Sequence, residues 1–83
     1  MDHKDFALNP KKYELFKTAV IESSIFTENG ESDLAVGTIV GVKFDGVRRN
    51  QLRRRDEPVY EITLQSGKFW GYLFANALTD FVL

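Results

Sequence analysis

Hydrophobic and polar residues alternate along residues 34–44, which is the pattern expected of a β-strand with two different faces. One face carries three apolar residues: Val40, Val42 and Phe44. Gly37 and Gly41 share the other face, and glycines inside a strand indicate a sharp bend or the close approach of another backbone. We therefore expect a strand that curves strongly, as strands do in very small barrels.

The remaining pattern predicts one helix and four further strands. Tyr13 and Phe16 recur at helical spacing after Pro10, a residue type that suits the first position of a helix. Gly67 suits a hairpin turn, because glycine adopts the positive φ that tight hairpins need. We expect a helix at 9–17, followed by a strand that begins at 18. The other three strands are expected at 59–65, 68–75 and 79–83, and turns at 28–31, 66–67 and 76–78.

The order of these elements indicates a mainly β fold. A short N-terminal helix followed by five strongly bent antiparallel strands is expected to form a small SH3-like barrel. We expect one domain over residues 1–83, with a flexible tail at 1–8, the helix at 9–17 and the barrel at 18–83. A chain this short buries only about 60% of its unfolded surface, so such domains often gain stability from disulfides, metals or partner subunits.

The composition argues against several kinds of chemistry. The chain has no cysteine and His3 is its one histidine, which leaves no material for disulfides or for a zinc site made of His and Cys. A Ser–His pair and a glycine-rich phosphate loop are also missing, so we expect no catalytic residues, no metal and no cofactor. No apolar run approaches the roughly 18 residues of a membrane span. A soluble, cytoplasmic protein without membrane contact is the expectation.

Charge is strongly segregated, although the net charge is only −1. Residues 37–55 carry six basic and one acidic residue, whereas the flanking segments are both acidic. The candidate binding residues lie in or beside the loop expected at 46–55, namely Asp45, Arg48, Arg49, Asn50, Gln51, Arg53, Arg54 and Arg55. Arginines bind phosphates and stack on bases, and the two amides suit base edges. The alternative is that Arg54 and Arg55 pair with Asp56 and Glu57, or with an acidic partner.

The strand expected at 68–75 is apolar on both faces. Alternation places Phe69 with Leu73 on one face, and Trp70, Tyr72 and Phe74 on the other. A strand buried on both sides needs cover from the helix or from another subunit, since an exposed apolar edge strand promotes aggregation. We expect an oligomer interface at the four aromatic residues Phe69, Trp70, Tyr72 and Phe74. A base-stacking platform is the alternative reading of the last three.

Three segments resemble the Sm-like family, which includes the Sm, LSm and Hfq proteins. GTIVGVKFD at 37–45 is similar to the first Sm motif, and GKFWGYLFANALTDFV at 67–82 is similar to the second. SSIFTENG at 23–30 resembles the first strand and following turn of Hfq. The resemblance implies an Sm-like fold and a homo-oligomeric ring of roughly five to seven subunits, joined through the fourth and fifth strands. It also implies single-stranded RNA bound around the central pore.

The residues that hold the base in this family are mostly replaced. Asp45 matches the aspartate of the first motif, but Val47 stands where a stacking aromatic or histidine is expected, and Arg49 where an asparagine is expected. In the second motif Phe74–Ala75 replaces an Arg–Gly pair. The resulting hypothesis is a non-catalytic ring protein that binds single-stranded RNA electrostatically through residues 46–55. The alternative is an SH3-like interaction or scaffolding module whose arginine loop docks an acidic partner.

Overall fold

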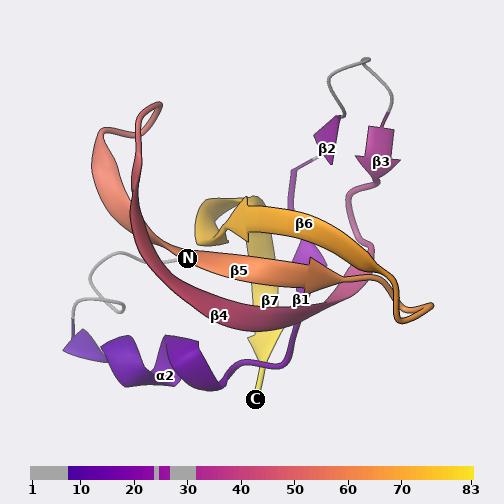
Figure 1. Ribbon diagram of the computed structural model, residues 1–83, viewed down its shortest axis with the longest axis horizontal. Coiled ribbons are helices and arrows are strands. Elements are labelled where there is room, and N and C mark those ends of the chain that lie inside the picture. The colour runs from indigo at the N-terminus through magenta and orange to yellow at the C-terminus, as the bar shows by residue number, and fades with distance from the viewer. Residues whose placement is uncertain (1–7, 24, 27–31) are drawn as a thin grey trace.

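The computed structural model describes residues 8–23, 25–26 and 32–83. Its main feature is a five-stranded antiparallel sheet with the strand order β6-β5-β4-β1-β7 (Figure 1). These strands are β1 (Thr18–Ile21), β4 (Ile39–Asn50), β5 (Arg55–Thr63), β6 (Phe69–Phe74) and β7 (Leu78–Val82). The other elements are the helix α2 (Pro10–Leu15), the two-stranded sheet of β2 (Ile25–Phe26) and β3 (Ser32–Leu34), and the 3-10 turn η1 (Ala75–Ala77).

The prediction of a mainly β fold with one short helix before a five-stranded antiparallel sheet is confirmed. The sheet curves strongly, and β6 and β7 lie at the two ends of its strand order (Figure 1). Closure of these strands into a barrel stays a prediction. Residues 1–7, which include His3 and most of the predicted tail, and the turn predicted at 28–31 lie outside the described residues.

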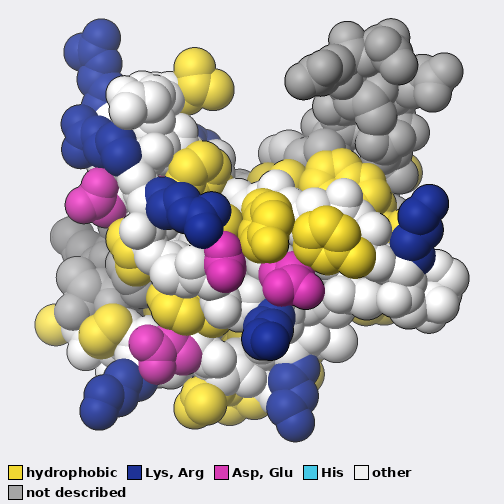
Figure 2. Space-filling view, viewed as in Figure 1, with side chains coloured by type: hydrophobic (Ala, Val, Ile, Leu, Met, Phe, Trp, Pro, Cys, Tyr) yellow, Lys and Arg dark blue, Asp and Glu magenta, His cyan; other side chains and the backbone are white. Residues whose placement is uncertain are grey.

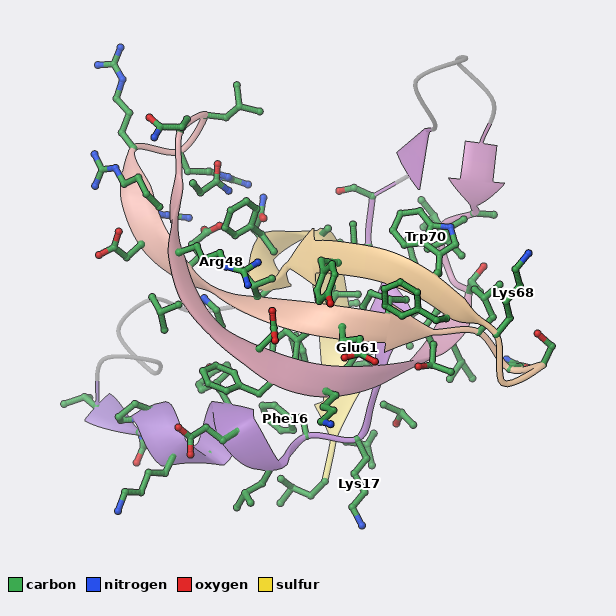
Figure 3. All side chains as sticks on the ribbon, viewed as in Figure 1. Phe16, Lys17, Arg48, Glu61, Lys68 and Trp70 are labelled. Carbon is green, nitrogen blue, oxygen red and sulfur yellow. The ribbon has the colours of Figure 1, made fainter. Side chains whose placement is uncertain are left out.

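The helix α2 is shorter than the predicted range of 9–17, because the backbone is already extended at Phe16. Lys17 N donates a hydrogen bond to Val82 O at 2.7 Å, so the chain has joined the sheet by this residue. The predicted apolar face is confirmed, since Tyr13 and Phe16 are both buried and their ring centroids lie 5.4 Å apart. Phe16 lies between α2 and the sheet in Figure 3. The aromatic face of α2 therefore attaches the helix to the sheet.

The strand predicted at 34–44 is wrong in its boundaries. β3 ends at Leu34 and β4 begins at Ile39, with a turn between them in which Thr38 N donates to Ala35 O at 3.1 Å. Gly37 has φ +92 and belongs to this turn rather than to a bent strand. Gly41 does lie within β4, where a Cβ would be in ordinary contact with Thr63. Only one of the two predicted strand glycines therefore lies in the strand.

The loop predicted at 46–55 is also wrong, because most of it is strand. β4 continues to Asn50 and β5 begins at Arg55, which leaves only residues 51–54 as the loop. Arg48 is in register with Glu57 and Arg49 with Asp56 across this extension, so the backbone ladder between β4 and β5 runs through most of the predicted loop. Pro58 is tolerated because β6 pairs with β5 only from Val59 onward, so β5 is an edge strand at Pro58.

The turns around β6 lie close to their predicted positions, although β5 ends at Thr63 and β6 begins at Phe69, so the first turn is longer than the predicted 66–67. Gly67 has φ +90, and its N–H donates to Leu64 O at 2.9 Å between β5 and β6. The short helical turn predicted at 76–78 is η1, one residue earlier in the chain. The interior is filled mostly by apolar side chains, of which the fully buried ones include Ile21, Val40, Tyr60, Ile62, Ala75 and Leu78.

Candidate nucleic-acid interface

The candidate interface is centred on the part of β4 and β5 that extends beyond the other strands. We call residues 47–58 the arginine hairpin, because all five arginines of the chain lie on it. Figure 1 shows it rising from one end of the sheet as a two-stranded ribbon. Arg48 and Arg49 belong to β4, Arg53 and Arg54 to the loop, and Arg55 begins β5. The fold therefore presents the arginines on a projecting hairpin instead of a long irregular loop.

A buried carboxylate holds the arginine hairpin together. Glu57 is completely buried, and it accepts hydrogen bonds from Asn50 Nδ2 at 2.8 Å and from Arg55 Nε at 3.2 Å. Asn50 is itself buried, and its Oδ1 accepts from the backbone N–H groups of Leu52 at 3.1 Å and Arg53 at 3.3 Å. A buried charge is tolerated only when such partners replace water. These bonds set the conformation of the loop at 51–54.

The same network reaches η1 through Asn76. The amide orientation of Asn76 is assigned from its neighbours. With its nitrogen toward Glu57, Asn76 donates to Oε2 at 3.3 Å, and its oxygen accepts from Arg53 Nε at 3.3 Å. The arginine hairpin and the turn between β6 and β7 are thus joined by side-chain hydrogen bonds. Because Glu57 and Asn76 lie 19 positions apart in the chain, their meeting depends on the tertiary fold.

The five arginines differ in their surroundings. Arg48 pairs with Asp45 at 2.6 Å, Arg55 pairs with Glu57, and Arg53 reaches Asn76. Arg49 and Arg54 are exposed and form no ion pair with any residue that the structure describes. The alternative predicted from sequence, in which Arg55 pairs with Glu57, is confirmed, whereas no such pair joins Arg54 to a described acidic residue. Arg49 and Arg54 are therefore the arginines best placed to meet a phosphate.

The other predicted binding residues have different positions. Gln51 is exposed in the loop, while Asn50 is buried and uses both ends of its amide within the hairpin. Asp45 lies at a bulge in β4, where Gly46 has φ +99, and it orients Arg48. Sequence reasoning named Glu57 only as a partner of an arginine in the alternative interpretation, and it did not consider Asn76. The available signal was weak, since an acidic residue two positions after an arginine is usually a solvated surface group.

The four predicted interface aromatics do not share one environment. Phe69 and Tyr72 are about half exposed, with relative exposures of 51% and 50%, whereas Trp70 contacts the core. The predicted alternation is wrong because of a bulge: Ile62 is opposite Gly71 but Thr63 is opposite Phe69, which leaves Trp70 as an extra residue. The bulge brings the rings of Phe69 and Tyr72 to the same side of β6.

The described residues contain no group of three His, Cys, Asp or Glu side chains placed to hold a metal ion. Within the same ranges, no helix has the length and apolar character needed to cross a membrane. Comparisons with family models, with curated proteins and with solved structures return no match for this chain. The resemblance to the Sm-like family therefore stays a prediction.

Proposed function

We propose that this protein is a non-catalytic, Sm-like ring protein that binds single-stranded RNA through the arginine hairpin. The observation that carries this proposal is the hairpin itself, which is ordered by the buried Glu57 and exposes Arg49 and Arg54 to solvent. Residues 47–58 carry five arginines against two acidic residues, one of which is buried. Phosphate contacts supply most of the affinity of proteins for nucleic acids, and a preordered hairpin loses little entropy on making them.

Ring assembly is supported by the edges of the sheet. β6 and β7 are the fourth and fifth strands of the sheet, and they occupy its two ends. Pairing of β6 in one subunit with β7 in the next is a head-to-tail contact, which closes into a ring when the rotation between subunits allows it. This pairing would provide hydrogen-bond partners for the backbone N–H and C=O groups at both sheet edges, which otherwise promote aggregation. A ring would repeat the arginine hairpin around one axis and multiply its positive potential.

The oligomer is tested by native mass spectrometry of the purified chain at micromolar concentration. We expect a single assembly whose mass is a multiple of 9.5 kDa, because both sheet edges are then paired. A second measurement at tenfold dilution should give the same mass if the ring is closed, since a closed ring has no growing end. A monomer, or a mixture of lengths that changes with concentration, would remove the ring from the proposal.

RNA binding is tested by reversing the two exposed arginines in the double variant Arg49→Glu/Arg54→Glu. Its matched control, Lys11→Glu/Lys17→Glu, makes the same change in net charge at exposed positions away from the arginine hairpin. Fluorescence anisotropy with a labelled mixed-sequence single-stranded RNA should show at least a tenfold loss for the hairpin variant. The slope of log affinity against log salt should fall by about 1.4, as expected when two phosphate contacts are lost.

Arg53 and Arg55 are left unchanged because they contact Asn76 and Glu57, so their loss would alter the hairpin as well as its charge. If the two double variants lose affinity equally, binding depends on net charge and the hairpin is not the site. Protein purified without nuclease should also show a raised ratio of absorbance at 260 nm to 280 nm.

A second candidate function is an interaction module that docks an acidic protein partner. Leu52 favours it, because this apolar side chain is 98% exposed at the tip of the hairpin, next to arginines. The buried centre of a protein interface is more apolar than its rim, and arginine is enriched in interfaces although other charged residues are depleted. Under this alternative the purified protein carries no nucleic acid, and the labelled RNA does not bind at physiological salt.

A further inference from the structure

We infer that the outer face of β6 stacks RNA bases on Phe69 and Tyr72, in continuity with the arginine hairpin. This inference rests on the proposed RNA-binding function and specifies a second contact surface for the same ligand. We call Phe69, Tyr72, Arg48 and Lys68 the aromatic face. It differs from the hairpin in chemistry, because its centre offers planar rings where the hairpin offers positive charge.

The two rings are placed for contact with a ligand from solvent. Phe69 and Tyr72 are each about half exposed, with ring centroids 5.6 Å apart and planes inclined by 70°. The core is filled from the other side of the sheet by residues such as Tyr60 and Ile62, so these rings are not needed to complete it. In proteins that bind single strands, exposed aromatic rings stack bases with little regard to sequence, because every base has a π-face.

Basic residues flank the rings at both ends. The guanidinium of Arg48 lies 5.9 Å from the centroid of the Tyr72 ring, and this residue belongs to the arginine hairpin. Lys68 is exposed at the opposite end, where Leu64, Lys68, Phe69 and Trp70 line an open pocket of about 300 Å³. Figure 3 shows Arg48 and Lys68 at opposite ends of the β5–β6 region. A strand of RNA could place phosphates at both ends and bases on the rings between them.

The acidic residues of this surface constrain how the RNA would lie. Glu61 is opposite both Lys43 and Tyr72 in the sheet, and Asp45 is paired with Arg48. Figure 2 shows acidic side chains beside the hydrophobic ones on this side of the molecule. A phosphate would be repelled at Glu61, whereas the amino group of a base can donate to a carboxylate there. With Lys43, Arg48 and Lys68 against Asp45 and Glu61, the surface keeps one excess positive charge.

The test is the double variant Phe69→Leu/Tyr72→Leu, which keeps apolar side chains but removes both rings. Its control is Leu15→Ala, which changes an exposed apolar residue on α2. In the anisotropy experiment with labelled single-stranded RNA, we expect about a tenfold loss of affinity for each ring. The slope against salt should not change, because base stacking releases no counterions. Quenching of the single tryptophan, Trp70, on RNA binding should report occupation of the neighbouring pocket.

The outcomes distinguish failure of this inference from failure of the proposed function. Normal affinity in the leucine variant, together with RNA binding by the wild-type protein, would overturn the aromatic face and leave the hairpin in place. Failure of the wild-type protein to bind RNA would overturn both. Native mass spectrometry of the same variant tests whether the two rings lie in a subunit interface. Loss of the assembly would show that they contact a second copy of the chain, and this result would also overturn the inference.

Discussion

Replacing Glu57 by alanine is expected to lower the free energy of unfolding by about 3 kcal/mol. The substitution removes a completely buried carboxylate that accepts from Asn50, Arg55 and Asn76. Asn50 Nδ2 then remains buried without this acceptor, and leaving a buried donor unsatisfied costs roughly 1–3 kcal/mol by itself. Urea denaturation of both proteins measures the difference.

Glu61→Ala is the matched control, because Glu61 is a partly exposed glutamate on the same strand. We expect a change of at most about 0.5 kcal/mol, as is usual for surface substitutions. Equal stability losses in the two variants would show that the buried network does not hold the hairpin.

The Glu57→Ala variant also tests whether RNA binding depends on the fixed conformation of the arginine hairpin or only on its charge. It removes a negative charge from the arginine hairpin, so a purely electrostatic hairpin would bind RNA more tightly. We expect weaker binding instead, because Asn50 and Asn76 lose the acceptor that fixes the loop relative to η1. The measurement is anisotropy at low temperature, where the variant is still folded. Tighter binding would mean that hairpin order does not contribute to affinity.

Replacing Tyr60 by alanine is expected to cost about 4 kcal/mol, because it leaves a cavity in the centre of the core. Tyr60 is completely buried, and its hydroxyl donates to Tyr13 O at 2.7 Å. Its ring also contacts Phe44 and Phe81. Tyr60→Phe keeps the ring and removes only the hydroxyl, so we expect a smaller loss of about 1–2 kcal/mol. The difference between the two variants separates ring packing from the hydrogen bond that ties α2 to the sheet.

Ionisation of Tyr60 is also expected to lower the stability of the folded protein at alkaline pH. Burial raises the pKa of the Tyr60 hydroxyl well above its ordinary value, and the nearby Tyr13 adds to the effect. In the unfolded chain this pKa is about 10, so the native state holds the proton more tightly. The resulting stability is complete below pH of about 10 and is lost as the pH rises further toward the native pKa.

Urea denaturation at a series of alkaline pH values should therefore show stability falling above pH of about 10. Tyr60→Phe should show a shallower decline, because it has no hydroxyl to ionise at this position. Tyr72→Phe serves as the control, since Tyr72 is half exposed on the outer face of β6. Parallel curves for the wild type and Tyr60→Phe would contradict the assignment of this alkaline loss of stability to Tyr60.

Much of the fold could be predicted from local patterns. The aromatic face of α2, the turn at Gly67 and the short turn before β7 depend on residues close together in the chain. Their signals are helical spacing, positive φ and the positions of alternating segments, all of which can be read over a few residues. The order of one helix and a five-stranded sheet follows from these signals.

The candidate site could be predicted only in part. The arginines were evident as a charge cluster, but the sequence did not distinguish Arg49 and Arg54, which are exposed, from Arg55, which is held by a buried carboxylate. The difference between these arginines depends on cross-strand pairing. β4 and β5 pair through most of the predicted loop, and Glu57 is buried in the folded protein. A sequence pattern gives the charge of a segment but not its partners across the sheet.

The sequence by itself determined the helix and the order of the five strands of the main sheet, because helical and strand periodicity are set by neighbouring residues. Only the tertiary structure decided strand boundaries, bulges and burial. The bulge at Trp70 brings Phe69 and Tyr72 to one side of β6, and the meeting of Glu57 with Asn76 joins the arginine hairpin to η1. Both depend on the register between strands, which is a property of two segments in contact and not of either segment alone.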